Sequence, residues 1–229
     1  DCPALYNSTA SELNKLRDKA IETNKKWAKK LHINESTAIT CIKPSGTVSQ
    51  LVDSASGIHP RYNDYYIRRV RNDKKDPLSQ TVIDAGVPYN TDPYNKSAWV
   101  FDFPMKAPNK AITRKDITPL SQLELWKHFA LNYCEHKPSM TCYVGDKDWP
   151  EVGGWVWKHF DIINGISFLP SSDEGHIYES APYEDISKDK YKELIKTMPK
   201  DIDWSSIIEE EDFTTSSQEF ACVADQCEI

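Results

Sequence analysis

Apolar and polar residues follow one another along the chain in patterns that predict a series of helices and strands. Near the N-terminus, apolar residues recur every three or four positions between lysine-rich faces, which predicts a long helix capped by Ser8 or Thr9. Runs rich in β-branched and aromatic residues predict strands, and broader apolar faces predict further helices. The predicted strands cover residues 37–42, 65–71, 99–103, 140–144 and 166–169, and the predicted later helices cover 77–85, 118–133, 152–160 and 188–197.

Between residues 99 and 169 the predicted order is strand, helix, strand, helix, strand. Because two parallel strands need a crossover between them, this order is typical of an α/β fold with a parallel sheet or barrel. After Pro170 the alternation stops, and one further helix is predicted. We expect residues 1–204 to form the folded part, and residues 205–229, which are acidic and contain several Ser and Thr, to form a flexible tail.

The composition is that of a globular protein. Of the 229 residues, 39% are hydrophobic and 11% are aromatic, enough for one substantial core or a large piece of a bigger one. The formal net charge of −7 argues against nonspecific nucleic-acid binding, because a phosphate backbone needs a basic surface. The sequence shows neither a membrane-spanning apolar run nor a signal-peptide pattern, so we expect a cytoplasmic protein without membrane contact. Its first residue is Asp, and we expect the sequence to continue a longer polypeptide.

The six cysteines are unevenly spaced and, in a chain of this length without a secretory signal, do not indicate a disulfide framework. Cys41 and Cys142 lie in apolar runs and are expected to be small, buried core residues. Cys134, His136 and Cys142 do not have the spacing of a standard zinc finger. No metal site is therefore predicted.

A turn with a glycine follows the first predicted strand and precedes a helix-like segment from Val48 to Val52. The free N–H groups at a helix N-terminus carry roughly half a positive charge and suit a phosphate group. Gly46 would let the backbone approach a ligand closely, and nearby hydroxyls add donors. A capped helix after a Pro-Ser-Gly turn would look the same, so this pattern alone leaves both interpretations open. The candidate phosphate-binding residues are Pro44, Ser45, Gly46, Thr47, Val48 and Ser49.

Two further groups of residues are candidates for chemistry. Cys222 and Cys227 are separated by four residues near the end of the sequence, and two thiols cannot complete a tetrahedral zinc site. A dithiol on a flexible arm suits thiol–disulfide exchange, although two incidental exposed cysteines remain the alternative. His59 and Arg61 follow the glycine turn by about a dozen positions. An isolated His is usually structural, but an adjacent Arg can pair with phosphate or an amide, so both are candidate contacts to substrate or cofactor.

The segment KPSGTVSQLVDSASGIHPRY at residues 43–62, followed by YYIRRVR, resembles the substrate-phosphate loop of adenosylcobalamin-dependent ribonucleotide reductases. The resemblance is strongest to the monomeric ribonucleoside-triphosphate reductase type. It covers nearly the whole chain in order and is specific in wording. The further matching motifs are DKKDPL, FDFPMKAP, LELWKHF, CEHKPS, ISFLP and the Cys-x4-Cys tail.

The resemblance implies a fold and an activity. The chain would be the C-terminal part of the family's ten-stranded α/β barrel, with a flexible redox tail. The enzyme would reduce the 2′-hydroxyl of a ribonucleotide, expected to be a triphosphate, by thiyl-radical chemistry with adenosylcobalamin, whose site would lie mostly outside this chain. The turn at residues 44–49 would bind the substrate phosphates. Cys222 and Cys227 would re-reduce the active-site disulfide and would themselves be reduced by a thioredoxin-type partner.

The family's radical cysteine, which lies in an Asn-x-Cys-x-Glu-type loop, has no counterpart in this sequence. We therefore expect the 229 residues to be inactive without the upstream part of the same enzyme. A di-iron ribonucleoside-diphosphate reductase would share the phosphate loop and the tail dithiol and is the nearest alternative. A nonenzymatic dithiol carrier or nucleotide-binding module is the alternative from another class. A glycyl-radical reductase is disfavoured, because its Arg-x-x-Gly-Tyr segment and four-cysteine cluster do not occur near the end.

Overall fold

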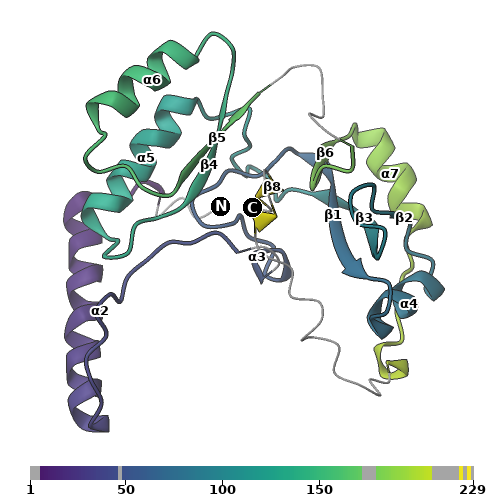
Figure 1. The fold of residues 1–229 in the computed structure, drawn as a ribbon, viewed down its shortest axis with the longest axis horizontal. Coiled ribbons are helices and arrows are strands. Elements are labelled where there is room, and N and C mark those ends of the chain that lie inside the picture. Colours follow the sequence, from purple (N-terminus) through teal and green to yellow (C-terminus); the bar gives the residue numbers. More distant parts are fainter. Residues whose placement is uncertain (1–5, 46–47, 172–178, 208–221, 224–225, 228–229) are drawn as a thin grey trace. The chain divides into compact units, whose positions relative to one another are not determined.

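The computed structural model of the chain describes residues 6–45, 48–171, 179–207, 222–223 and 226–227 (Figure 1). The chain divides into two compact units. The helix unit comprises the residues up to 61 together with 110–171, and the sheet unit comprises 62–109 together with 172–228. The predicted boundary between residues 204 and 205 stays a prediction. Of the helices that the structure describes, none is both long and apolar enough to cross a membrane.

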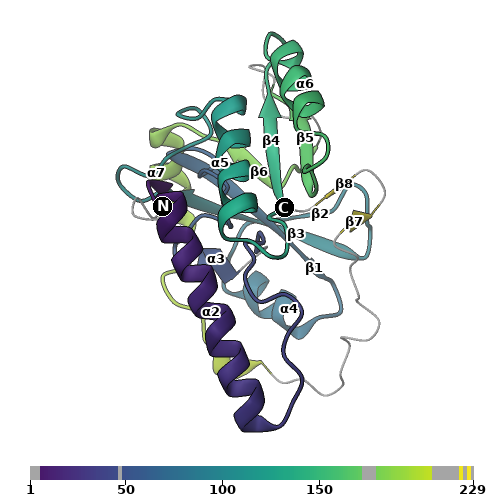
Figure 2. The ribbon, with the colours of Figure 1, turned by 90° about the vertical axis from the view of Figure 1, so that its left-hand side faces the viewer.

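A strand–helix–strand motif forms the centre of the helix unit. β4 and β5 pair in parallel, with Met140 opposite Ile166, and α6 connects them. α5 and α6 pack against this pair (Figures 1 and 2). Thr118 caps α5 by accepting a hydrogen bond from the N–H of Ser121. The motif confirms the predicted α/β order for this stretch. The bounds are Pro119–Asn132 for α5, Met140–Val144 for β4, Trp149–Lys158 for α6 and Ile166–Pro170 for β5.

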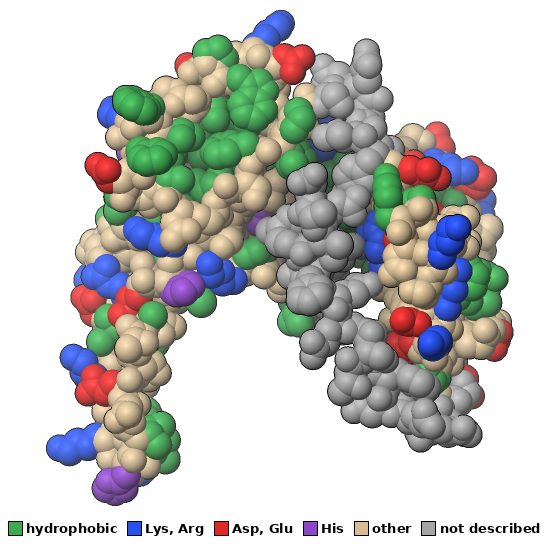
Figure 3. Space-filling model, in the orientation of Figure 1, with side chains coloured by type: hydrophobic (Ala, Val, Ile, Leu, Met, Phe, Trp, Pro, Cys, Tyr) green, Lys and Arg blue, Asp and Glu red, His purple; other side chains and the backbone are tan. Residues whose placement is uncertain are grey.

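The core of the helix unit lies between these elements. Trp126 of α5 and Cys142 of β4 are completely buried, and the Trp126 indole N–H donates to the carbonyl of Pro138 at 2.9 Å. This bond satisfies the polar atom of the largest buried side chain. On the outer surface, apolar side chains gather over α6 (Figure 3), where Trp157 and Phe160 are 83% and 70% exposed.

The predicted N-terminal helix is α2, Ala10–Leu31. Of the two predicted cap residues, Ser8 and Thr9, Thr9 is the cap, and it forms a capping box with Glu12. α2 packs against α5, but of its apolar residues only Leu13 and Ala28 are buried. The other apolar side chains of the predicted face, such as Leu16, remain exposed. The helix was therefore predicted correctly, whereas its apolar face is covered only in part.

The predicted strand at residues 37–42 is not a strand in the structure. It is linked to the segment after α5 by a single bridge, between Cys41 and His136. The Thr40 hydroxyl donates to the carbonyl of Tyr133 at 2.6 Å, and the Glu135 carboxylate accepts from the N–H of Thr40 at 3.3 Å. Since a strand is defined by its partner, a segment with one bridge does not qualify. For the same reason Cys41 is exposed, which corrects the expectation that it is buried; Cys142 is buried as expected.

The sheet unit contains a four-stranded sheet in the order β2-β3-β1-β6. All its pairs are antiparallel, with Tyr65 opposite Lys106 at one end of the long β1–β3 pair. The predicted parallel arrangement is therefore wrong for this sheet. β1 and β3 each contain both buried and partly exposed residues. Such incomplete burial suits antiparallel strands, because parallel strands are normally buried on both faces. The bounds are Tyr65–Asp73 for β1, Pro77–Asp84 for α4, Tyr89–Thr91 for β2, Ala98–Lys106 for β3, Tyr183–Asp185 for β6, Lys188–Thr197 for α7 and Trp204–Ser206 for a 3-10 turn.

Two arginines of β1 hold the sheet unit together. Arg69 donates to Asp102 of β3 at 3.0 Å and also pairs with Glu184 of β6. Arg71 pairs with Asp92, whose carboxylate also accepts from two N–H groups of the following turn. Burial raises the pKa of Asp102 despite the nearby guanidinium. Because each arginine bridges separate segments of the chain, these charges fix the sheet rather than line a solvated face.

The described strands form three sheets, of four, two and two strands. The α/β class is confirmed, and no closed barrel is present among the residues that the structure describes. The ten-stranded barrel stays a prediction.

Candidate functional site

The candidate phosphate loop lies in the helix unit, where residues 43–61 fold back on themselves. Gly57 has a φ of +58°, and a Cβ there would lie 3.3 Å from the carbonyl carbon and oxygen of Lys43. A side chain at this position would be strained and would crowd the backbone at the start of the loop. The loop therefore depends on a glycine at position 57. Gly46 and Thr47 lie outside the described residues.

A serine pair joins the two ends of the loop. The Ser56 hydroxyl accepts from the N–H of Ser45 at 2.7 Å and donates to the Ser45 carbonyl at 3.0 Å. The Ser45 hydroxyl accepts from the N–H of Ser49 at 3.0 Å, which stabilises the short helix α3, Val48–Leu51. The N–H groups of Ser45 and Ser49 are therefore engaged inside the loop, and Pro44 has none. Binding of phosphate by the six predicted residues stays a prediction.

His59 connects this serine pair to the sheet. Its Nε2 accepts from the N–H of Thr141 in β4 at 2.8 Å, so the proton of the neutral ring is on Nδ1, which donates to the Ser56 carbonyl at 2.7 Å. Burial lowers the pKa of His59, which favours this neutral form. Both ring nitrogens are thus engaged by backbone groups. A direct contact between His59 and a ligand stays a prediction.

Arg61 anchors the far end of the loop. It is 2% exposed, and it donates to the carboxylate of Asp53, which is 66% exposed, at 3.1 Å. Its backbone N–H donates to the carbonyl of Ile112 at 2.8 Å and forms part of a bridge to Thr113. The guanidinium faces its own loop rather than open solvent. Its predicted contact with substrate or cofactor stays a prediction.

The pattern-based search missed the residues that hold the loop in place. Ser56 and Thr141 carry no motif of their own, because their roles depend on which segments fold together. Lys43 was also missed as a charge: it immediately precedes Pro44 and is exposed, and its ammonium group donates to the Ser139 hydroxyl at 2.8 Å. Its position directly before a Pro-Ser-Gly-Thr turn could have revealed it, since a lysine beside such a turn offers a point charge to phosphate.

The tail cysteines lie opposite each other in the backbone pairing. β7, Cys222–Val223, and β8, Gln226–Cys227, are antiparallel, with Cys222 as the register partner of Cys227. Opposed residues in antiparallel strands have Cα atoms roughly 4.5–5.5 Å apart, which lies within the range that a disulfide needs. Most of the predicted flexible arm, residues 208–221, lies outside the described residues.

Two buried cysteines, Cys134 and Cys142, are poor candidates for thiol exchange. Burial raises the pKa of Cys134 to about 11 and that of Cys142 to about 12. The thiolate is the form that attacks disulfides and binds metals, so neither group suits exchange at neutral pH. Among the described residues, no three His, Cys, Asp or Glu side chains are arranged to hold a metal ion.

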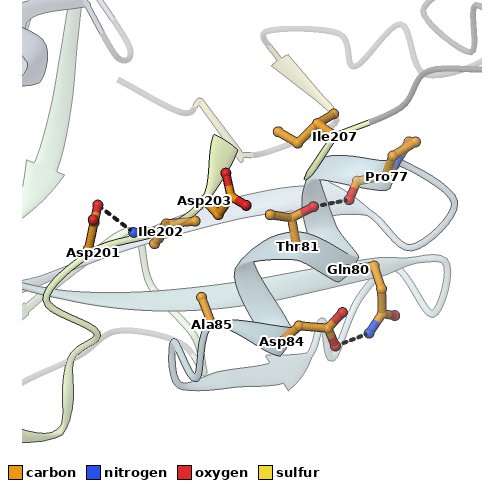
Figure 4. Close-up of a pocket in the computed structure, with 9 residues that line it drawn as sticks. All are labelled: Pro77, Gln80, Thr81, Asp84, Ala85, Asp201, Ile202, Asp203 and Ile207. Atoms are coloured by element: carbon orange, nitrogen blue, oxygen red, sulfur yellow. Dashed lines mark hydrogen bonds between the residues drawn. The ribbon is translucent and has the colours of Figure 1, made fainter. Parts of the chain in front are cut away.

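A groove of about 530 Å³ in the sheet unit was not predicted from the sequence (Figure 4). It lies between α4 and the segment after α7 and presents the carboxylates of Asp84, Asp201 and Asp203. All three are exposed, and Asp84 accepts from the side-chain amide of Gln80 at 2.7 Å. An acidic, open groove of this kind does not suit a phosphate.

The chain is similar to several known reductases, although no model of a protein family matches it. It is 31% identical over 205 residues to the adenosylcobalamin-dependent ribonucleoside-triphosphate reductase of Euglena gracilis, covering 86% of this chain and 27% of that protein. It is 30% identical over 190 residues to a probable enzyme of the same name from Dictyostelium discoideum, covering 81% and 25%. It is 27% identical over 194 residues to the enzyme of that name from Lactobacillus leichmannii, covering 82% and 26%.

A solved structure shares the fold. The crystal structure of a B12-dependent, class II ribonucleotide reductase superimposes with a TM-score of 0.67 and 23% identity, covering 84% of this chain and 27% of the other. The chain spans about a quarter of the length of the curated relatives that it matches. Over that quarter, the chain is homologous to proteins named adenosylcobalamin-dependent ribonucleoside-triphosphate reductase.

Proposed function

We propose that this chain is the part of a ribonucleotide reductase that holds the substrate phosphates and carries the reducing dithiol. The complete enzyme would replace the 2′-hydroxyl of a ribonucleoside triphosphate with hydrogen. The observation that carries this proposal is the closed loop at residues 43–61 in a chain related to ribonucleoside-triphosphate reductases. We propose the cytosol as its location.

The loop offers a phosphate two kinds of interaction. The N–H groups of Gly46, Thr47 and Val48 would donate to phosphate oxygens, as N–H groups at a helix start do. The ammonium group of Lys43, exposed where the loop begins, would add a positive charge. The Ser45 and Ser49 N–H groups, being engaged, would serve as the frame rather than as ligands. Because the phosphates lie far from the 2′-hydroxyl along the substrate, the loop would bind and orient rather than take part in the radical step.

Adenosylcobalamin would start the radical chemistry when bound, but the described residues do not fit it. Arg61, the side chain considered for a corrin amide, is buried against Asp53. The groove beside α4 is lined by three carboxylates and is open to solvent. We therefore propose that the corrin binds to the part of the enzyme outside this chain.

The incomplete pairing at residues 37–42 supports the proposed barrel. This β-branched segment has a single bridge, and β4 and β5 form a sheet of only two strands. A two-stranded parallel sheet is unusual, because parallel sheets are normally larger and covered on both faces. We propose that strands from the remainder of the reductase pair with these segments to complete the ten-stranded barrel.

The tail would supply reducing equivalents. The thiolate of Cys222 or Cys227 would attack the active-site disulfide, forming a mixed disulfide and releasing one active-site thiol. The other tail thiol would then attack the mixed disulfide, which releases the second active-site thiol and leaves the tail as a disulfide. Two electrons and two protons are transferred in total. A thioredoxin-type dithiol would reduce the tail again. The opposed register of the two cysteines suits the disulfide form.

The experiment is the substitution Gly46→Val in the complete polypeptide, with turnover of a ribonucleoside triphosphate measured in the presence of adenosylcobalamin and a dithiol. A β-branched side chain there would prevent close approach of phosphate and misplace several donors together, so nucleotide affinity should fall at least about tenfold. Gly153→Val is the matched control, because a Cβ at Gly153 in α6 meets nothing within 4 Å. Unchanged affinity in a folded Gly46→Val enzyme would refute the phosphate-loop proposal. Activity with a di-iron radical subunit instead of cobalamin would favour the diphosphate-reductase alternative.

A further inference from the structure

An unbroken chain of hydrogen bonds runs from strand β4 to the phosphate loop. It begins at the N–H of Thr141, which donates to Nε2 of His59, and continues from Nδ1 of His59 to the carbonyl of Ser56. The Ser56 hydroxyl then holds both the N–H and the carbonyl of Ser45. Finally, the Ser45 hydroxyl accepts from the N–H of Ser49. The two hydrogen bonds of the His59 ring and the two between the Ser56 hydroxyl and the Ser45 backbone have donor–acceptor distances between 2.7 and 3.0 Å.

From this arrangement we propose that His59 is a positioning residue for the phosphate-binding turn, acting through Ser56 on Ser45. The inference rests on the proposed function of the loop and assigns a role that the sequence pattern did not. An imidazole suits this role because it is rigid and carries one acceptor and one donor on opposite sides of the ring. The acceptor fixes the ring on β4, a strand of the core, and the donor fixes the carbonyl of Ser56. These bonds thereby fix the position of Ser45, and with it the start of α3, relative to the sheet.

The same arrangement predicts which kinetic parameter depends on His59. Ser45 stands directly before Gly46, Thr47 and Val48, whose N–H groups are the proposed phosphate donors. If Ser45 is released, the turn loses its fixed starting point, but nothing at the reacting ribose carbon changes. Loss of the chain of bonds should therefore raise the KM for the nucleotide and leave kcat nearly unchanged, which is the signature of lost uniform binding.

Three variants of the complete enzyme test the proposal. His59→Ala removes both bonds of the ring, and Ser56→Ala breaks the next connection while leaving the His59–Thr141 bond in place. His59→Gln retains an acceptor for Thr141 but lacks the fixed donor, and it serves if the alanine variant does not fold. Ser54→Ala is the matched control, because the Ser54 hydroxyl lies in the same loop and donates to the carbonyl of Ala55, outside the chain of bonds described above. KM and kcat for a ribonucleoside triphosphate are measured for each, and for the double variant of His59 and Ser56.

We expect His59→Ala and Ser56→Ala each to raise KM by about fivefold to tenfold, with kcat within about twofold of the wild type. Because the two residues act in series, the double variant should raise KM no further than the larger single effect, within about twofold. Ser54→Ala should match the wild type. Additive effects on KM, or an effect on kcat alone, would overturn the proposal, since a merely structural residue has no reason to couple with Ser56 in nucleotide binding.

The test separates this inference from the function beneath it. If Gly46→Val weakens nucleotide binding while His59→Ala and Ser56→Ala do not, the loop binds phosphate but His59 does not position it. If Gly46→Val also has no effect, the proposed function of the loop fails first, and the positioning role falls with it.

Discussion

Replacement of Gly57 by Ala should loosen the candidate phosphate loop by an amount that the geometry sets. Gly57 has a φ of +58°, and adoption of this left-handed conformation by an alanine costs about 1–2 kcal/mol. The new Cβ would also lie 3.3 Å from the backbone of Lys43, which cannot move as a side-chain tip can. Overpacking of this kind adds about 1–3 kcal/mol, so the loop should lose about 2–5 kcal/mol of local stability.

Gly86→Ala provides the control that divides this cost into its two parts. Gly86, just after α4, has a φ of +90°, but a Cβ there meets nothing within 4 Å. It should therefore show the conformational cost of about 1–2 kcal/mol without the crowding. The difference between the two variants isolates the contact between Gly57 and Lys43.

The measurement is hydrogen exchange of the peptides that cover residues 43–61 and the end of α4, in the complete enzyme. A loss of about 2 kcal/mol or more accelerates exchange through local opening by about 30-fold or more, and this should appear in the loop of the Gly57→Ala variant. The KM for the nucleotide should rise with it, by about fivefold if 1 kcal/mol of the loss falls on the binding conformation. Exchange no faster than in the Gly86→Ala variant, with an unchanged KM, would refute the reasoning that the loop must close tightly against Lys43.

Four further outcomes are expected. Burial lowers the pKa of His59 below its usual 6.5, so its bond to Thr141 stabilises the fold fully above about pH 6.5 and less as the pH falls through the lowered value. In urea unfolding, the difference in stability between the wild type and His59→Gln should therefore shrink over that pH range. A difference that does not change with pH would contradict this. Replacement of both tail cysteines by Ser should allow the pre-reduced complete enzyme one turnover and then block further turnover with thioredoxin as reductant. Dithiothreitol should partly restore turnover. Full multiple turnover with thioredoxin alone would disprove the exchange role. In the folded protein, iodoacetamide at pH 8 should label the exposed Cys41 and spare Cys134 and Cys142, as measured by mass spectrometry. Equal labelling of all three cysteines would be inconsistent with the burial of Cys134 and Cys142. The 229 residues alone should show no ribonucleotide turnover with adenosylcobalamin and a dithiol, and robust activity would show that the radical cysteine lies within them.

The elements that the sequence predicted well are those with strong local signals. Thr9 and Thr118 begin α2 and α5 with caps that can be recognised from sequence alone, and α7 covers the predicted residues 188–197. Strand partners were less accessible. β1 and β3 were both predicted as strands, but their antiparallel pairing depends on a turn and a hairpin that return the chain, and local periodicity does not report this. The segment 37–42 has strand composition without a strand partner.

The candidate site shows the same division. The residues of the turn could be proposed from the sequence because their types suit phosphate chemistry and follow one another. The framework was not found, because Thr141 becomes a partner of His59 only when residues 82 positions apart fold together, and Ser56 meets Ser45 only when the loop closes. His59 itself was noted for the chemistry of its ring, whereas the structure engages both of its nitrogens with backbone groups. Sequence patterns thus identified the groups that would meet the ligand and missed those that hold them.

The two-stranded sheet of β4 and β5 has a consequence for handling this protein. Neither strand has a second strand partner among the described residues. In β4 the N–H and the carbonyl of Thr141 bond to the side chains of His59 and Gln122, so it is the outer side of β5 that offers N–H and C=O groups to a new partner. Natural proteins protect such edges with charges, bulges or covering segments, because an open edge recruits strands from other molecules. β5 is Ile-Ser-Phe-Leu-Pro and carries no charge, and its one proline is the last residue of the strand. Produced alone, the chain should therefore aggregate by strand pairing between copies, and production together with the remainder of a reductase should keep it in solution.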